Sequence, residues 1–199
     1  MLNIYLLRHG QTAWNADGNR YCGRADLSLT EKGIKQAEAV YDQLINVTFD
    51  AIYSSPLQRA YVTAQIVSGE KEVVKDDRLI EVDFGNWEGK PKEQFIEEDK
   101  ELWNNWIIDP SVTKAGGTGE TALEVIERAD DFFRTLQTEY KTGKILVVAH
   151  NGINRFYLAY KLGMNLKDYR KLTVQNSTVS MFQLDEEGEL TLVHLNSKL

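Results

Sequence analysis

The stretch Asn3-Ile4-Tyr5-Leu6-Leu7-Arg8-His9-Gly10 decides how the rest of the chain is interpreted. Its apolar residues predict a buried strand, and Arg8 and His9 follow at the point where that strand ends. Open α/β sheets bind ligands at the carboxyl ends of their strands. Arginine carries a fixed positive charge on a planar fork of donors, and a neutral histidine beside it can attack phosphorus. The glycine that follows lets the backbone approach a ligand closely.

Strand-like and helix-like segments alternate along most of the 199 residues. Strands are predicted at 3–7, 49–53, 72–74, 144–149, 179–184 and 190–195, with 78–84 extended and the last two strands forming a hairpin. Helices are predicted at 31–45 with Thr30 as N-cap, 56–67, 92–106, 120–140 and 153–162. We therefore expect a three-layer α/β fold with a mainly parallel sheet, helices on both faces and a small helical cap. The expected arrangement is a single domain over 1–199, with the cap at about 91–119.

The composition indicates a globular protein, with 42% hydrophobic and 27% charged residues. A formal net charge of −7 argues against binding to nucleic acid or anionic membranes, so an anionic ligand needs a local basic pocket. The single cysteine, Cys22, excludes an internal disulfide and is typical of a reducing compartment. The sequence shows neither a signal-peptide pattern nor an apolar run of ~20 residues, and we expect a cytoplasmic monomer or homodimer.

Three predicted strand ends carry the same kind of chemistry. The first presents Arg8 and His9, the second leads into a helix start with Arg59, and the third ends at His150. Neighbouring parallel strands would bring these side chains to one edge, where helix starts add N–H donors that favour anions. Such a site binds phosphate without a metal or organic cofactor, because the protein supplies the positive charge. The acidic run at 97–101 is interpreted as a solvated helix face rather than a metal site.

Phosphoryl transfer also requires an acid for the leaving group, and Glu81 is the candidate. It lies at the edge of the segment predicted to be extended. To act as an acid, its carboxyl group has to hold a proton near neutral pH. The alternative is an ordinary glutamate that forms a salt bridge with Arg78.

Four blocks follow one another along the chain: Arg8-His9-Gly10-Gln11-Thr12, 54–59 (Ser-Ser-Pro-Leu-Gln-Arg), Leu79-Ile80-Glu81 with 84–89 (Phe-Gly-Asn-Trp-Glu-Gly), and Val147-Val148-Ala149-His150. In this order they resemble the histidine phosphatase superfamily, also called the phosphoglycerate mutase-like family, nearly end to end. The resemblance implies that His9 becomes phosphorylated and that Arg8, Arg59 and His150 hold the phosphoryl oxygens. It implies that Glu81 protonates the leaving oxygen.

The same resemblance implies further phosphate contacts. Asn15 is expected to contact the phosphoryl group, and an N–H of Asn151 or Gly152 is expected to assist. Asn151 departs from the glycine, glutamine or threonine more usual after the second histidine. Residues 19–23 also depart from the common pattern, with one more residue than usual.

Two branches of the superfamily compete as interpretations. A phosphatase releases the phosphoryl group to water, whereas a phosphoglycerate mutase returns it to another hydroxyl. Cofactor-dependent mutases usually carry a longer insertion after the glutamate block, while this chain soon reaches the glycine-rich run 116–120. The short form favours the phosphatase branch. A module that only senses a phosphorylated metabolite is a third alternative.

Within the phosphatase branch the chain is most similar to α-ribazole phosphatases of cobalamin-nucleotide assembly. The residues that carry this similarity are 17–18, 84–88, 97–99, Trp106, 162–164 and 195–197. Phosphoserine and broad-specificity phosphatases of the same family share most of the core motifs. The expected substrate, a small phosphorylated metabolite, is therefore α-ribazole 5′-phosphate or a phosphate ester of these other classes.

The pocket for the leaving group is expected to include Gln11, Tyr21, Cys22, Gly23 and Trp106. Cys22 is interpreted as a small pocket filler rather than as a nucleophile. Trp106 either packs the cap onto the sheet or stacks on a flat base of the substrate.

Overall fold

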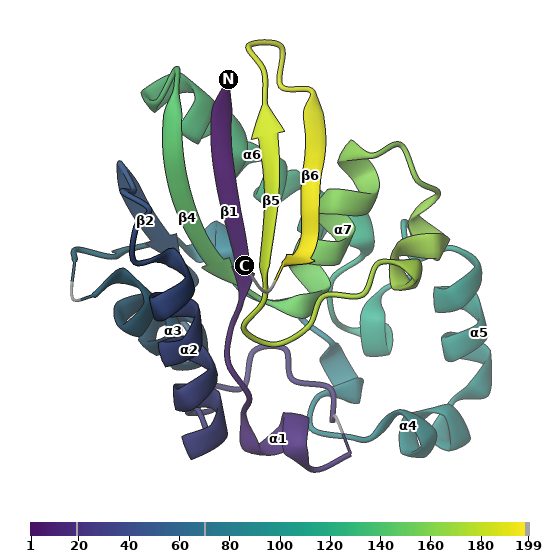
Figure 1. Cartoon of the computed structure of the whole chain (residues 1–199). Helices are drawn as coiled ribbons and strands as arrows, with labels where there is room; N and C mark the ends of the chain where they lie inside the picture. The colour runs from purple at the N-terminus through teal and green to yellow at the C-terminus, as the bar shows by residue number, and fades with distance from the viewer. Residues whose placement is uncertain (19, 70, 198–199) are drawn as a thin grey trace.

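A computed structural model of the chain describes residues 1–18, 20–69 and 71–197 (Figure 1). Its sheet contains β1 (Leu2–Arg8), β2 (Ala51–Ser54), β3 (Val74–Lys75), β4 (Gly143–Ala149), β5 (Val179–Leu184) and β6 (Leu190–Ser197). The strand order is β3-β2-β4-β1-β5-β6. The pairs β3–β2, β2–β4 and β4–β1 are parallel, whereas β1–β5 and β5–β6 are antiparallel. The expected α/β fold is confirmed, and the sheet is mixed because the predicted hairpin joins it at one edge.

Helices of two kinds surround the sheet. The α-helices are α1 (Ala13–Ala16), α2 (Glu31–Leu44), α3 (Gln58–Ser68), α4 (Lys92–Glu98), α5 (Lys100–Ile108), α6 (Ala122–Glu139) and α7 (Asn151–Lys161). The 3-10 helices are η1 (Asp77–Leu79), η2 (Gly85–Trp87), η3 (Ala115–Gly117) and η4 (Leu166–Lys171). No helix in the described part of the chain combines the length and apolarity needed to cross a membrane.

The two faces of the sheet carry separate apolar cores, because successive side chains of a strand point to opposite faces. On β4, Ile145 and Val147 belong to the core that includes α6 and α7. Leu146 and Val148 belong to the core that includes α2 and α3. Figure 1 shows α2 and α3 on one side of the sheet and α6 behind it. Burial of alternate residues therefore fixes the central strands between two helical layers.

Side-chain caps define the starts of the long helices. The Thr30 hydroxyl accepts the Gly33 N–H at 3.1 Å, which confirms the predicted N-cap of α2. Thr121 and Glu124 form a capping box at the start of α6, since each side chain accepts a main-chain N–H of the other.

Three local predictions are wrong. The helix predicted at 92–106 is divided at Asp99, whose side chain accepts the Leu102 N–H and caps α5. Residues 78–84 are not extended throughout, because Asp76 caps the turn η1 by accepting the Arg78 N–H. Pro56 precedes the helix instead of lying in its first turn, because α3 begins at Gln58.

Candidate active site

His9 follows β1 directly, and its main-chain N–H donates to Ala149 O on β4 at 3.1 Å. Its ring Nδ1 lies 2.7 Å from Gly10 O. Because a carbonyl oxygen only accepts, Nδ1 carries the hydrogen of this bond, and in the neutral ring Nε2 keeps its lone pair. The side chain is 4% exposed. His9 therefore presents Nε2 from a fixed ring.

His150 lies beside His9, with the two ring centroids 5.1 Å apart. The parallel pairing that sets Arg8 opposite Ala149 places both histidines at one edge of the sheet. Burial lowers the pKa of both imidazoles well below the usual range, and the charge of Arg59 lowers each further. Both ring nitrogens of His150 are buried without a hydrogen-bond partner among the described residues. The site thus holds two neutral imidazoles, one of them with free nitrogens.

Two arginines, Arg59 and Arg8, lie near enough to the histidines for their charges to add to burial in lowering both imidazole pKa values. Arg59, in the first turn of α3, is fully buried and donates to Ala25 O at 2.6 Å and to Gly23 O at 2.8 Å. Arg8 donates to Val174 O at 2.8 Å. Burial lowers the pKa of Arg8 to about 10, with Glu81 opposing this shift and Arg155 and Arg59 adding to it. Neither arginine forms an ion pair with a carboxylate in the described part of the chain, so their charge is available to an anion.

The loop that carries His9 is fixed by close backbone contact with α2. A Cβ added to Gly10 would lie 2.5 Å from Gly33 O. The Gly10 N–H donates to the Thr63 hydroxyl of α3 at 3.1 Å, and that hydroxyl donates to Arg59 O at 2.7 Å. The nucleophile loop and the arginine helix are therefore joined through one threonine.

The Glu81 carboxylate lies at the start of α7 and is 3% exposed. Its Oε2 accepts the Gly152 N–H at 2.9 Å, and its Oε1 accepts the N–H groups of Ile153 and Val82, both at 2.9 Å. The Gly152 N–H, one of the two donors expected to assist in binding phosphate, donates to Glu81 in this structure, and its contact with phosphate stays a prediction. The alternative pairing with Arg78 is also wrong, since Arg78 pairs with Asp76 and Asp131.

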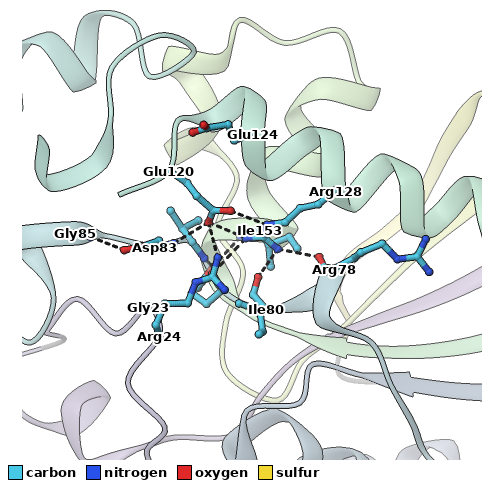
Figure 2. A network of polar contacts seen from close by, with 12 residues as sticks. Gly23, Arg24, Arg78, Ile80, Asp83, Gly85, Glu120, Glu124, Arg128 and Ile153 are labelled. Atoms are coloured by element: carbon cyan, nitrogen blue, oxygen red, sulfur yellow. Dashed lines mark hydrogen bonds and ion pairs between the residues drawn. The ribbon is translucent and has the colours of Figure 1, made fainter. Parts of the chain in front are cut away.

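A second polar network holds the segment that carries Glu81 (Figure 2). Arg128 on α6 donates to the carbonyls of Arg78 at 2.8 Å, Ile80 at 2.6 Å and Glu81 at 3.3 Å. It also pairs with Glu120, with Nε 2.9 Å from Oε1. Burial raises the pKa of Glu120, but the hydrogen bonds and charge of Arg128 outweigh burial and lower it. Arg128 thus anchors the glutamate by its main chain.

A cavity of about 260 Å³ opens onto these groups. It is lined by Arg8, His9, Asn15, Gly18, Arg20, Tyr21, Cys22, Glu81, Phe84, Lys92, Glu93, Asn151, Gly152, Arg155, Phe156, Tyr169 and Arg170. Arg59 and His150 are fully buried, and His150 lies against His9. The structure therefore brings together the residues predicted at the three strand ends.

The two predicted asparagines differ in their surroundings. Asn15 Oδ1 accepts the Thr12 N–H at 3.1 Å and lies 3.4 Å from Asn176 Nδ2, so it caps α1 at the cavity wall. Asn151 Oδ1 is buried without a partner among the described residues. In the departing segment 19–23, Asn19 lies outside the described residues.

Three predicted pocket residues lie outside the cavity. Trp106 is fully buried among Trp87 and Phe156, and its indole N–H donates to the Tyr169 hydroxyl at 3.4 Å. The Gln11 side chain instead accepts the Thr30 hydroxyl at 3.1 Å. Gly23 is buried, and a side chain there would meet Val82 O at 2.3 Å. The alternative of base stacking on Trp106 is therefore wrong, because the indole is fully buried, and the packing role is confirmed.

Cys22 lines the cavity, and burial raises the pKa of its thiol to about 11. A thiol with such a pKa stays protonated near neutral pH. The structure thus agrees with a side chain that fills space.

Sequence reasoning missed Arg155, Tyr169 and Arg170, all of which line the cavity. Arg155 had a usable signal: it follows Asn151 by one helical turn, which places both on one face of α7. Arg170 and Tyr169 lie in η4, where no periodic pattern indicates which side chains face the cavity. Within 1–18, 20–69 and 71–197, no three His, Cys, Asp or Glu side chains are grouped as metal ligands.

Comparison with known proteins agrees with this geometry. Residues 4–198 match the histidine phosphatase superfamily (branch 1). The chain is 32% identical over 194 residues to phosphoserine phosphatase 1 of Hydrogenobacter thermophilus, covering 96% of this chain and 91% of that protein. It is 30% identical over 200 residues to adenosylcobalamin/alpha-ribazole phosphatase of Escherichia coli, covering 99% and 97%. A crystal structure of phosphoserine phosphatase from Entamoeba histolytica in complex with 3-phosphoglyceric acid superposes with a TM-score of 0.90 at 30% identity, covering 99% and 98%.

The phosphatase branch expected from the short insertion is supported by all three relatives, whose names are those of phosphatases. With a family match over nearly the whole sequence, and with two buried histidines beside Arg8 and Arg59, the chain belongs to the histidine phosphatase superfamily, branch 1, as a phosphoric monoester hydrolase.

Proposed function

We propose that this hydrolase acts without a metal, through a phosphohistidine formed at His9. One observation carries the proposal: a buried neutral His9 presents Nε2 at the cavity, with the free nitrogens of His150 beside it. A neutral imidazole is a nucleophile toward phosphorus, and an N–H of the second imidazole can donate to a phosphoryl oxygen. Arg8 and Arg59 add fixed positive charge where the transferred group gathers negative charge.

In the first step, His9 Nε2 attacks phosphorus while the bond to the leaving oxygen breaks. The Glu81 carboxyl group donates its proton to that oxygen. Oε2 accepts one N–H whereas Oε1 accepts two, so Oε2 is the oxygen with room for the proton. In the second step, the Glu81 carboxylate takes a proton from water, whose oxygen attacks phosphorus. The P–N bond then breaks, which restores neutral His9 and protonated Glu81.

Two candidates compete for the leaving group. α-Ribazole 5′-phosphate, and with it a place in cobalamin assembly, is supported by the relative from Escherichia coli. Phosphoserine is supported by the relative from Hydrogenobacter thermophilus and by the likeness to the Entamoeba histolytica enzyme. In either case we propose a cytoplasmic monomer or homodimer that acts on a small metabolite, without nucleic-acid or membrane partners.

The test is phosphate release in EDTA from α-ribazole 5′-phosphate, O-phosphoserine, 3-phosphoglycerate and p-nitrophenyl phosphate. We expect turnover in EDTA and a loss of at least ~10³-fold in kcat in His9→Ala. His194→Ala is the matched control, because His194 is exposed on β6. Unchanged turnover in His9→Ala, or no turnover in EDTA that Mg²⁺ restores, would contradict the proposal. Conversion of 3-phosphoglycerate to its 2-isomer would indicate the mutase reaction instead.

A further inference from the structure

The cavity has a second group of positive charges, separate from Arg8 and Arg59. Its lining contains five cationic side chains and two carboxylates, although the chain as a whole carries a net charge of −7. Of the five, only Arg8 has a role in the mechanism above, and Arg155 on α7 and Arg170 on η4 are two of the other four. Their position in the same cavity raises the question of which part of a substrate they contact.

Arg170 is held in a defined orientation. One of its terminal nitrogens donates to the Tyr21 hydroxyl at 2.6 Å. The guanidinium carbon lies 4.9 Å from the ring centroid of Trp103 and 5.2 Å from that of Tyr169. Its Nε is buried and has no acceptor among the described residues. A guanidinium fixed on aromatic rings, with a buried donor unused, is prepared for an anionic acceptor.

Arg155 lines the same cavity as Arg170 and Arg8, and its charge adds to burial in lowering the pKa of Arg8. Its Nε donates to Leu172 O at 2.5 Å, which fixes the stem. It follows Asn151 by one turn of α7. Burial lowers the pKa of Arg155, and the charge of Arg170 lowers it further, as expected for neighbouring guanidinium groups. Neither arginine forms an ion pair with a carboxylate in the part of the chain that the structure describes.

We propose that Arg155 and Arg170 bind a carboxylate on the leaving group, so that the preferred substrates are phosphomonoesters of small hydroxy acids or hydroxy amino acids. The inference rests on the proposed function, because it assigns the phosphoryl group to His9 and the carboxylate to the other end of the same cavity. Guanidinium groups match the planar carboxylate with paired donors. The cavity of about 260 Å³ lies below the ~300–1,000 Å³ of sites for drug-sized ligands, which suits a compact acid.

The inference separates the two candidate leaving groups. The alcohol of phosphoserine bears a carboxylate, whereas α-ribazole bears none. We therefore expect α-ribazole 5′-phosphate to be the poorer of the two substrates.

A pair of esters that differ only in the carboxylate provides the test. O-Phosphoserine and O-phosphoethanolamine share the phosphate, the amine and the carbon spacing between them. We expect kcat/KM to be roughly 10- to 100-fold higher for phosphoserine, the range for charge-assisted hydrogen bonds. 3-Phosphoglycerate against glycerol 3-phosphate should show a preference of the same sign. A ratio near one for both pairs would overturn the inference.

Variants assign the preference to the two arginines. Arg155→Gln and Arg170→Gln should each reduce the phosphoserine to phosphoethanolamine ratio of kcat/KM, and Arg170→Lys should reduce it less than Arg170→Gln. Arg134→Gln on α6, whose side chain is 73% exposed, removes the same charge and should leave the ratio unchanged. Turnover of phosphoethanolamine by each variant reports folding. A ratio that stays at the wild-type value in both Gln variants would overturn the assignment.

A binding measurement distinguishes failure of this inference from failure of the proposed function. Calorimetric titration of the His9→Ala protein measures the affinity for each ester without turnover. If the wild-type protein releases phosphate from none of the esters tested, α-ribazole 5′-phosphate included, the proposed function fails, while a tighter affinity for phosphoserine would still support the carboxylate site. Equal affinities for the two esters would overturn it.

Discussion

Replacing Arg128 by methionine tests whether the network of Figure 2 positions Glu81. The substitution keeps much of the aliphatic stem and removes the guanidinium. It leaves Glu120 without its closer cationic partner and takes a donor from the carbonyls of Arg78, Ile80 and Glu81. The two side chains of the ion pair are 17% and 18% exposed, so water replaces these bonds incompletely.

The magnitude follows from burial. Removing one partner of a buried ion pair costs about 3–5 kcal/mol, and the lower part of that range applies because the carbonyls regain some water. We therefore expect Arg128→Met to lower the free energy of unfolding by about 3 kcal/mol. Arg24 pairs with the same Glu120, but its side chain is 41% exposed, so Arg24→Met should cost about 0–1 kcal/mol. Urea denaturation followed by tryptophan fluorescence measures both values.

Activity gives a second readout that a merely structural role would not move in the same way. A less firmly positioned Glu81 should slow the hydrolysis of alkyl phosphates more than that of p-nitrophenyl phosphate. The leaving oxygen of an alkyl phosphate needs a proton, whereas p-nitrophenolate leaves without one. Arg128→Met should thus lower the ratio of kcat for phosphoserine to kcat for p-nitrophenyl phosphate under folded conditions. A stability loss below about 1 kcal/mol together with an unchanged ratio would refute this role of Arg128.

Three further predictions follow from buried groups. Because the folded-state pKa values of His9 and His150 lie below that of the unfolded chain, near 6.5, the unfolded state binds more protons in acid. The free energy of unfolding should therefore be retained above about pH 6.5 and fall below that pH by up to ~1.4 kcal/mol per pH unit for each histidine. Denaturation at several pH values measures this, and a free energy of unfolding that does not change between about pH 6.5 and 5 would contradict it. Gly33→Ala should destabilise the protein by about 1–3 kcal/mol, instead of giving the gain usual for this change in a helix, because the new Cβ would lie 2.2 Å from Gln11 O. A higher melting temperature of the variant would disprove this. Cys22 should react with iodoacetamide at pH 7.5 far more slowly than free cysteine, since its pKa is raised to about 11, and mass spectrometry that finds rapid labelling would refute that assignment.

Much of the site was predictable because it depends on parallel pairing. Arg8, His9 and His150 each follow an apolar run, and such runs in an α/β pattern become neighbouring central strands whose ends share an edge. The start of α2 was equally predictable, since Thr30 bonds only three residues ahead.

Other features depend on tertiary contacts that leave no local pattern in the sequence. The side chain of Trp106 could have faced the core or a ligand, and packing against Trp87 and Phe156 decides for the core. Two of the three N–H donors to Glu81, those of Gly152 and Ile153, come from α7, about 70 residues away. Sequence alone therefore did not show that Glu81 accepts the Gly152 N–H. Arg170 reaches the cavity through a 3-10 turn, which has no amphipathic period to read.

The position of β1 also governs the order in which the protein acquires its activity during synthesis. Leu2 pairs with Gly143 of β4 on one side and with Leu184 of β5 on the other. The strand β1, purple in Figure 1, therefore stays unpaired until the ribosome has synthesised both of these later strands. Pairings this distant in sequence raise contact order and slow folding. A nascent chain that ends before β4 exposes the apolar residues of β1 and lacks His150, so it is inactive and prone to aggregation. We therefore expect activity to arise only in a late stage of folding, after β4 and β5 have paired with β1 on its two sides.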